Sequence, residues 1–520
     1  MVLDVGDRLV KALHEHNPWW ERGTEAFSLP ARQKSDFYHL ARPGQSGSQF
    51  EDRPLLGIVG RRGAGKTTLL KQYIAHRIES GVEPERFLYL PFDADPLYQL
   101  RSDEQLRRAV RYYESRILGR TGGDGPHFVF LDDVHRIGHR NKPTIDGWGR
   151  PVTDLIDDSR ERHVTVTAST TVQIERELDD VGLSPRRYDV QPVLPEKFRD
   201  YLFSLYPDLE EPDRRVSPTS VRTGDSSIPA VLDGTDPSAL VTELREKYRR
   251  VSAAKSRVQS KVVDYLVMGG TISYDREGVV ETADDLSEAD YVRLRDDVRT
   301  VLYEEVPGFE SIKTIADLER LCALAAHNSG AKPIRYQELV ELFDVDRRTI
   351  ADSYLPALAE LYLLTAVTEY DNARPRSVQL YLRDTGLLTA LADGSAQRAL
   401  GDFDREVDLA RVAGFDHTMR FAYGINAARG DTGEPSVQFW RGRNGEVDYV
   451  FEVGDRPVPV GLAYRPPADD TLAAIREFLD SYDVPVGLLL TGDTVSTDRP
   501  ITLRDDRVIQ LPYWFYLLLC

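Results

Sequence analysis

Eight consecutive residues near the start of the chain have the types and the spacing needed to bind phosphate. They follow the apolar stretch Leu55–Val59 and read Gly60-Arg61-Arg62-Gly63-Ala64-Gly65-Lys66-Thr67. This is the Walker A pattern in the context it requires, a buried strand, a glycine-rich loop and a helix. Glycines let backbone N–H groups turn toward a phosphate, and the positive end of the following helix adds to the attraction. The pattern predicts a cradle for the phosphates of ATP.

Two side chains of this loop have roles of their own. The ammonium of Lys66 is expected to meet the β- and γ-phosphate oxygens, and the hydroxyl of Thr67 is expected to bind a magnesium ion. The alternative is a glycine-rich turn without a ligand, and the flanking strand and helix argue against it. We therefore predict a site for ATP and Mg²⁺ whose nucleotide contacts come from Gly60, Arg61, Arg62, Gly63, Ala64, Gly65, Lys66, Thr67 and Thr68.

A second candidate segment, Phe128–Asp133, is an apolar strand that ends in two carboxylates. It resembles the Walker B element. Asp132 would hold the magnesium ion through water, and Asp133 would orient the water that attacks the γ-phosphate. Most relatives carry glutamate at the second place, and aspartate is one methylene shorter, so slow hydrolysis is expected. The alternative interpretation is a solvated turn that carries two acids.

Hydroxyl side chains end a third strand, His163–Thr170. In P-loop ATPases of the AAA class a polar residue at this place senses the γ-phosphate, and Ser169 or Thr167 is the candidate. An ordinary strand end is the alternative for either residue. Further along, Arg186 and Arg187 precede another apolar strand. An arginine there could reach a phosphate across a subunit interface of a homo-oligomer, whereas a surface pair is the simpler interpretation.

Length and composition bound the class of protein. The chain has 520 residues, of which 41% are hydrophobic and 29% charged, as in soluble proteins with several compact units. We see no apolar run near the roughly 20 residues of a membrane span and no secretory signal at the start. The two cysteines, Cys322 and Cys520, fit a reducing compartment and exclude a disulfide framework and a Cys-based zinc site. We expect a cytoplasmic protein without a membrane partner.

The formal net charge of -19 would ordinarily argue against a nucleic-acid partner, because such a charge repels phosphate. However, acidic residues are abundant, arginine outnumbers lysine, and no lysine follows Lys332, a pattern that resembles proteins of salt-loving archaea. At 1 M salt the Debye length is about 3 Å. The net charge therefore does not decide what can approach the surface.

The order of strand and helix patterns predicts two α/β regions separated by a helical one. From Leu55 short strands alternate with helices. The strands expected there are Leu55–Val59, Phe87–Pro91, Phe128–Leu131, Val164–Thr167 and Tyr188–Val193. Two short amphipathic helices at Ile334–Leu364 form a helix–turn–helix pattern. Strands return at Val378–Leu382, Val437–Trp440, Glu446–Val453, Val458–Ala463 and Val486–Thr491.

Three further motifs, added to the two Walker segments and the hydroxyl-rich strand, resemble a known family. They are Asn17-Pro18-Trp19-Trp20, Tyr381–Leu388 with the letters Y-L-R-D-T-G-L-L, and Phe439–Tyr449 with the pattern W-R…E-V-D. The chain is similar over most of its length to prokaryotic AAA-type ATPases with a C-terminal domain of unknown function, DUF4143. The stretch Asp208–Thr300 matches this family only loosely, and Tyr265–Gly270 is its best-matching segment.

The resemblance implies a multidomain α/β protein. We expect a doubly wound P-loop NTPase core with a helical lid, a winged-helix-like module and a second, nuclease-like α/β domain. The expected boundaries are residues 1–50 for an N-terminal helical extension, 51–205 for the AAA-type core, 206–310 for a linker and the lid, 311–370 for the winged-helix-like module and 371–520 for the nuclease-like domain.

The C-terminal domain departs from the nuclease pattern that the resemblance implies. In such folds an acid on one strand and a Glu-x-Lys pair on the next hold the metal and stabilise the attacked phosphate. Asp448 matches the first acid, and Glu406 is a candidate on the preceding helix. Gly461 and Ala463 stand where glutamate and lysine belong. We therefore expect a binding or scaffolding domain without nuclease activity.

Two functions stay open at this point. Arg347 and Arg348 in the helix–turn–helix segment face away from its apolar stripe and could contact double-stranded DNA. Asp346, Asp352 and Glu360 dilute that charge, and such modules also serve as spacers. One hypothesis is an ATPase that couples turnover to a DNA or protein partner. The other is a nucleotide-gated binding or scaffold module with little turnover.

Overall fold

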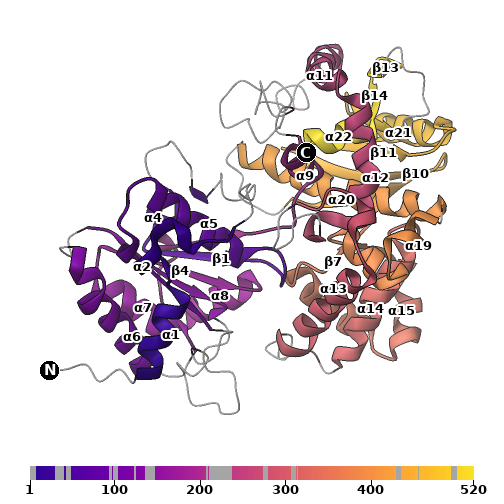
Figure 1. The fold of residues 1–520 in the computed structure, drawn as a ribbon. Coiled ribbons are helices and arrows are strands. Elements are labelled where there is room, and N and C mark those ends of the chain that lie inside the picture. Colours follow the sequence, from indigo (N-terminus) through magenta and orange to yellow (C-terminus); the bar gives the residue numbers. More distant parts are fainter. Residues whose placement is uncertain are drawn as a thin grey trace. The chain divides into compact units, whose positions relative to one another are not determined.

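In the computed structural model the chain divides into two compact units. The first comprises Met1–Leu194 with two short later segments, and the second comprises the remainder, beginning at Pro195 (Figure 1). The structure describes residues 7–29, 40–41, 48–92, 97, 103–121, 125–134, 147–206, 209, 237–272, 279–305, 312, 314–401, 403–428, 435–454, 456–492 and 500–520. The linker that we expect after residue 206 lies largely outside these ranges.

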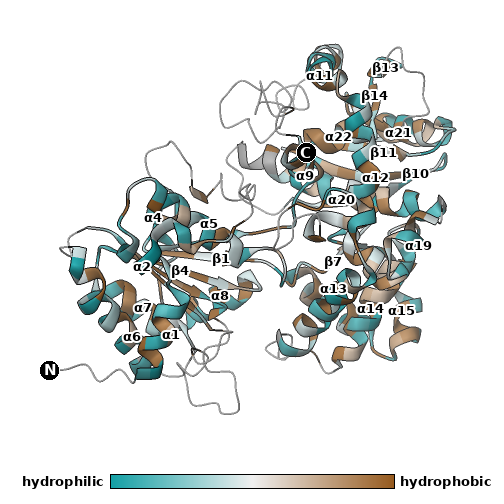
Figure 2. Ribbon diagram, viewed as in Figure 1, coloured by the Kyte–Doolittle hydropathy of each residue, from teal (hydrophilic) through white to brown (hydrophobic). Residues whose placement is uncertain are grey.

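A five-stranded sheet forms the centre of the first unit. Its strands are β1 (Leu55–Val59), β2 (Phe87–Pro91), β3 (His127–Asp132), β4 (Arg162–Ala168) and β5 (Tyr188–Pro192). They lie in the order β2-β3-β4-β1-β5, and all four pairings are parallel. Every residue of β1, β2 and β3 is buried, which fits the continuous apolar runs of a sheet covered on both faces. Figure 2 shows these strands largely in the hydrophobic colour.

Helices connect these strands and cover the sheet. They are α5 (Lys66–Glu79), α6 (Asp103–Arg116), α7 (Gly149–Asp158) and α8 (Thr171–Asp180). The N-terminal helices α1 (Asp7–His16) and α2 (Trp19–Arg22) contribute to the same hydrophobic core, which includes Leu13, Trp19 and Trp20. The unit is thus the expected α/β P-loop core. The expected strands are confirmed, with β1 and β2 matching residue for residue.

The strand order determines where a ligand can bind. From β1 the chain passes to the far edge of the sheet, returns through β3 and β4, and then crosses β1 to reach β5. Connections from the neighbouring strands β1 and β4 therefore leave in opposite directions at their carboxyl ends. In open α/β sheets the crevice at such a switch point is the usual ligand site.

The second unit begins with helices and a small antiparallel sheet. The helices are α9 (Phe198–Leu205), α11 (Pro237–Ser252), α12 (Lys255–Ile272), α13 (Glu288–Thr300), α14 (Ile315–Asn328), α15 (Tyr336–Phe343), α16 (Arg347–Thr349) and α17 (Leu355–Glu360). The strands β6 (Ile334–Arg335), β7 (Leu364–Val367) and β8 (Ser377–Leu382) pair in the order β6-β8-β7. Strand β8, which we placed in the C-terminal domain, thus pairs with the strands that flank the helix–turn–helix segment.

A six-stranded mixed sheet follows. Its strands are β9 (Val437–Arg441), β10 (Glu446–Val453), β11 (Arg456–Ala463), β12 (Gly487–Thr491), β13 (Thr502–Arg504) and β14 (Val508–Pro512), in the order β13-β14-β12-β11-β10-β9. The helices of this region include α18 (Thr385–Leu388), α19 (Ala396–Gly401), α20 (Phe403–Ala428), α21 (Asp469–Tyr482) and α22 (Tyr513–Leu519). Helix α21 packs on β10, β11 and β12. Among the described residues, no helix is long and apolar enough to cross a membrane.

Candidate nucleotide-binding site

The glycine-rich loop leaves β1 at the carboxyl edge of the sheet. Gly60 has φ +156°, and a Cβ built there would lie 2.3 Å from the carbonyl oxygen of Val193, so only glycine fits. Gly65 has φ +91° and directly precedes α5. A residue with a side chain rarely adopts that left-handed conformation. The backbone therefore requires glycine at both positions, and the N-terminus of α5 opens toward the loop.

Lys66 places a positive charge inside this loop. Its ammonium donates hydrogen bonds to the carbonyl oxygens of Gly60 at 2.6 Å and Arg61 at 3.3 Å, and the residue is buried. Arg61 is buried too, whereas Arg62 and Gly63 are exposed. A buried ammonium bound to neutral carbonyls gains strongly when an anion approaches. This arrangement fits the phosphate site that the sequence predicts.

Asp132 ends β3, two strands away from the loop, and three hydroxyl groups donate to its carboxylate. Thr67 donates to Oδ2 at 2.6 Å and Tyr89 to the same oxygen at 2.7 Å, while Thr167 donates to Oδ1 at 2.6 Å. Asp132 is only 3% exposed. The expected magnesium ligands Thr67 and Asp132 are therefore in direct contact.

Thr167 links the two acids that end β3. Its hydroxyl oxygen accepts a hydrogen bond from the Asp133 N–H at 2.7 Å and donates to Asp132. Asp133 is half-buried and has φ +56°, a left-handed conformation that few residues with a side chain adopt. Such strain is often found where a side chain must point to a substrate. Thr167 is thus the hydroxyl of β4 that the structure brings to the acids.

Of the other residues that the sequence predicts for the site, Ser169 lies at the edge of the sheet where the acids lie, whereas Arg186 and Arg187 lie far from the glycine loop. Ser169 follows β4 at the same carboxyl edge and is buried, with its N–H donating to Gln173 Oε1 at 3.3 Å. Arg186 and Arg187 precede β5, whose first residue pairs with the first residue of β1. They therefore lie at the amino-terminal ends of the strands, whereas the glycine loop lies at the carboxyl ends. Arg187 forms an ion pair with Asp157 at 2.7 Å. The structure thus does not bring the two arginines to the loop of their own chain.

The donor set fits a magnesium ion. Among the described residues, no group of three or more His, Cys, Asp and Glu side chains could hold a metal. Magnesium in nucleotide sites is usually bound by one or two carboxylates together with phosphate oxygens and water. Thr67 and Asp132, whose side-chain oxygens lie 2.6 Å apart beside the glycine loop, provide oxygen ligands of that kind. They are too few to bind the ion without a nucleotide.

Tyr89 is a site residue that the sequence analysis missed. It lies two residues before the end of β2, and its hydroxyl reaches Asp132 on the neighbouring strand. A signal was present, since an apolar strand rarely needs a tyrosine near its carboxyl end unless the hydroxyl has a partner. The partner can be identified only once β2 and β3 are known to be adjacent in the sheet.

Asp448 and Glu406, the metal ligands that the nuclease resemblance implies, have other partners in the second unit. Asp448 on β10 accepts the Leu462 N–H at 2.7 Å and lies 3.7 Å from the guanidinium of Arg411. Burial raises the pKa of its carboxyl to about 6, against the opposing effects of Arg411 and the Leu462 N–H. Glu406 instead accepts the Tyr464 hydroxyl at 2.7 Å.

The surroundings of Gly461, on the strand beside Asp448, leave little space for a side chain. A Cβ built on Gly461 would lie 2.5 Å from the side chain of Thr471 and 2.9 Å from that of Ile475, both on α21. A glutamate there would require the side chains of Thr471 and Ile475 to shift. The expectation that this domain has no nuclease activity stays a prediction.

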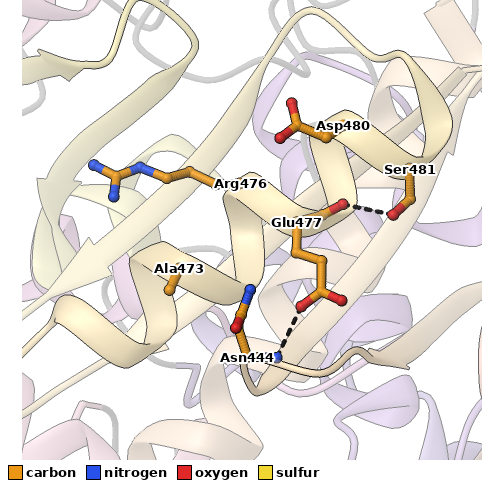
Figure 3. A pocket seen from close by; sticks show the side chains of 6 residues that line it. All are labelled: Asn444, Ala473, Arg476, Glu477, Asp480 and Ser481. Carbon is orange, nitrogen blue, oxygen red and sulfur yellow. Dashed lines mark hydrogen bonds between the residues drawn. The ribbon is translucent and has the colours of Figure 1, made fainter.

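A surface hollow of about 460 Å³ lies elsewhere in this domain. Its lining residues are Asn444, Ala473, Arg476, Glu477, Asp480 and Ser481 (Figure 3). The Glu477 carboxylate accepts the N–H groups of Arg443 and Asn444 at 2.9 and 2.8 Å. Glu477 thus holds the turn between β9 and β10, which is a structural task.

The two arginines of the helix–turn–helix segment are both engaged. Arg347 lies over the ring of Tyr336 at 4.6 Å and donates to the Pro375 carbonyl at 2.7 Å. Arg348 is 89% exposed and forms an ion pair with Asp352 at 3.4 Å. Arg348 therefore presents its charge to solvent more fully than Arg347.

Comparisons with known proteins agree with the geometry of the first unit. Residues 52–202 match the model of a family described as an AAA domain. This range contains the glycine loop, both acids and Thr167, and it is an AAA-type P-loop domain. Residues 279–398 match the model of a domain of unknown function, DUF8612. The relation to DUF4143 stays a prediction.

Among solved structures, the chain is similar to the Walker-type ATPase of Pyrococcus abyssi at 13% identity and a TM-score of 0.36, over 66% of this chain and 91% of that one. It is also similar to the ORC2 protein of Aeropyrum pernix in its ADPNP–ADP complexes, at 15% identity and a TM-score of 0.36, over 76% of this chain and 98% of that one. A comparison with curated proteins finds no match.

Proposed function

We propose that the AAA-type domain binds ATP with Mg²⁺ and hydrolyses it slowly to ADP and phosphate. The observation that carries this proposal is the meeting of Lys66, Thr67 and Asp132 at the switch point of a parallel sheet. Lys66 neutralises phosphate charge, and Thr67 with Asp132 would hold the metal, which supplies charge neutralisation at the phosphates when it is bound.

The remaining residues would act on the attacking water and on the nucleotide state. We assign the orientation of that water to Asp133 and the link between Asp133 and the metal ligand to Thr167. Ser169 is a second hydroxyl at the same edge. Arg186 and Arg187 are kept as candidates that would serve a neighbouring subunit of a homo-oligomer, because they lie at the far edge of their own sheet.

A second candidate function is a nucleotide-gated binding or scaffold module with little turnover. The short Asp133 side chain favours this candidate, because it extends its carboxylate one methylene less far than a glutamate would. A steady-state turnover assay separates the two. Release of phosphate well above the rate of a Lys66→Ala variant supports the enzyme, and equal rates support the gated module.

The second unit would bind the partner. The order of α14, β6, α15, α16, α17, β7 and β8, with β6 paired to β8, supports a winged-helix-like module. Double-stranded DNA and a protein are both proposed partners, and the exposed Arg348 is the contact that DNA would use. Duplex binding that persists unchanged, including its salt dependence, after replacement of Arg347 and Arg348 by alanine would exclude this helix as the DNA contact.

The proposal for ATP is tested by calorimetric titration of the protein with ATP and Mg²⁺. Lys66→Ala should abolish measurable binding, because a buried phosphate charge would lose its cation. Lys11→Ala is the matched control, since Lys11 is 79% exposed on α1 and pairs with Glu15. Tight binding by the Lys66 variant would show that the loop is not the nucleotide site.

A further inference from the structure

The Asn17-Pro18-Trp19-Trp20 segment lies along the edge strand β2. The Asn17 side chain accepts the Tyr89 N–H at 2.7 Å and donates to the Tyr89 carbonyl at 2.9 Å. The indole N–H groups of Trp19 and Trp20 donate to the Phe87 carbonyl at 3.2 and 2.8 Å. These side chains bind the strand edge as a neighbouring strand would, so they fix the backbone of Tyr89.

The side chain of Tyr89 carries this constraint to the metal ligand. Its hydroxyl donates to Asp132 Oδ2 at 2.7 Å, and both residues are only 3% exposed. A tyrosine side chain has two rotatable torsions, so a fixed backbone leaves its hydroxyl little freedom. A path of contacts therefore runs from Asn17 through Tyr89 to the carboxylate of Asp132.

Tyr89 differs from the other donor to the same oxygen. Thr67 is itself an expected magnesium ligand, whereas Tyr89 lies on the side of the carboxylate formed by β2. Groups behind a metal ligand that hold its orientation are commonly worth about 10- to 100-fold in metal affinity. Tyr89 and Thr167 are placed to provide that support.

We propose that Tyr89 is a positioning residue for the magnesium ligand Asp132, and that Asn17 acts through Tyr89. The inference rests on the proposed site for ATP and Mg²⁺. It gives the N-terminal Asn-Pro-Trp-Trp segment a role in that site, in addition to covering a strand edge.

The test measures ATP affinity by calorimetry with Mg²⁺ and with EDTA, in the parent and in Tyr89→Phe. The ratio of the two affinities reports the metal site alone. Tyr89→Phe should lower this ratio about 10- to 100-fold and leave the affinity in EDTA unchanged. Tyr113→Phe is the matched control, because Tyr113 on α6 is buried and its hydroxyl has no hydrogen-bond partner among the described residues. It should behave like the parent.

A second variant tests the role of Asn17. Asn17→Ala should lower the same ratio, and it should have no further effect on the ratio in a Tyr89→Phe background, since both act on one contact. A Tyr89→Phe ratio equal to that of Tyr113→Phe overturns the inference while leaving the nucleotide site intact. A parent protein that binds ATP equally well with Mg²⁺ and EDTA overturns the proposed metal site itself.

Discussion

Thr167→Val is the perturbation with the most calculable effect, because it removes one hydroxyl and leaves the volume almost unchanged. Thr167 is fully buried, so no water can replace the lost oxygen. The change deletes the hydrogen bond to the Asp132 carboxylate and leaves the Asp133 N–H without its acceptor. Bonds to charged groups contribute about 1.5–3 kcal/mol, and a stranded buried donor costs about 1–3 kcal/mol.

The two losses share one hydroxyl and are not independent, so we expect the first unit to lose about 2–4 kcal/mol of unfolding free energy. Denaturant unfolding followed by tryptophan fluorescence measures this loss, since Trp19 and Trp20 lie in the core of the same unit. Thr165→Val is the matched control. Thr165 is equally buried two residues earlier on β4, where its register partners are Leu56 and Phe130.

We expect the Thr165 variant to lose less than about 1 kcal/mol, because it does not touch the acids that end β3. We also expect Thr167→Val to bind ATP in EDTA as the parent does and to turn it over more slowly, since Asp133 loses its backbone anchor. If the two valine variants unfold at the same denaturant concentration, Thr167 does not bridge the acids as the structure shows.

Two further predictions concern the other carboxylates. Asp133→Asn should keep ATP binding and lower turnover, because it preserves shape but removes the group that orients water; an unchanged rate of phosphate release would assign that task elsewhere. Asp448→Asn should change the pH dependence of stability. The folded-state pKa of about 6 lies above the usual 3.8, so folding is favoured while Asp448 is protonated, and this advantage is lost as pH rises from about 4 to 6. The free energy of unfolding of the asparagine variant should therefore rise relative to that of the parent over this range, by at most about 3 kcal/mol. Parallel stability curves between pH 4 and 7 would show that Asp448 is not destabilised by burial.

The sequence was sufficient to predict the parts of the fold that depend on residues adjacent in the chain. Strands β1 and β2 were predicted to the residue because each is a short, continuous apolar run between clear boundaries. The glycine loop was predicted because its chemistry depends on adjacent residues. Strand β7 was missed, since Leu364–Val367 follows a helical stripe without a break in hydrophobic pattern.

The contacts behind the site could not be read from the sequence in the same way. Tyr89 and Asp132 are 43 positions apart, and Asn17 and Tyr89 are 72 positions apart. Their contact depends on which strands are neighbours. The order β2-β3-β4-β1-β5 cannot be predicted from any short stretch of the sequence. For the same reason Thr167 and Ser169 were equal candidates until the register of β3 and β4 placed Thr167 beside the acids.

Asp132 and Asp448 show why one site is proposed to bind a metal and the other is not. Both are carboxylates on a strand of a central sheet, Asp132 buried and Asp448 half-buried. Asp132 receives three neutral hydroxyls, which orient its oxygens without supplying a competing positive charge. Asp448 instead lies beside the guanidinium of Arg411, which already provides the positive charge that a metal would bring and repels a second cation. A carboxylate with neutral donors beside a glycine loop is therefore the better ligand for Mg²⁺, whereas a carboxylate beside an arginine already has a cation as its partner.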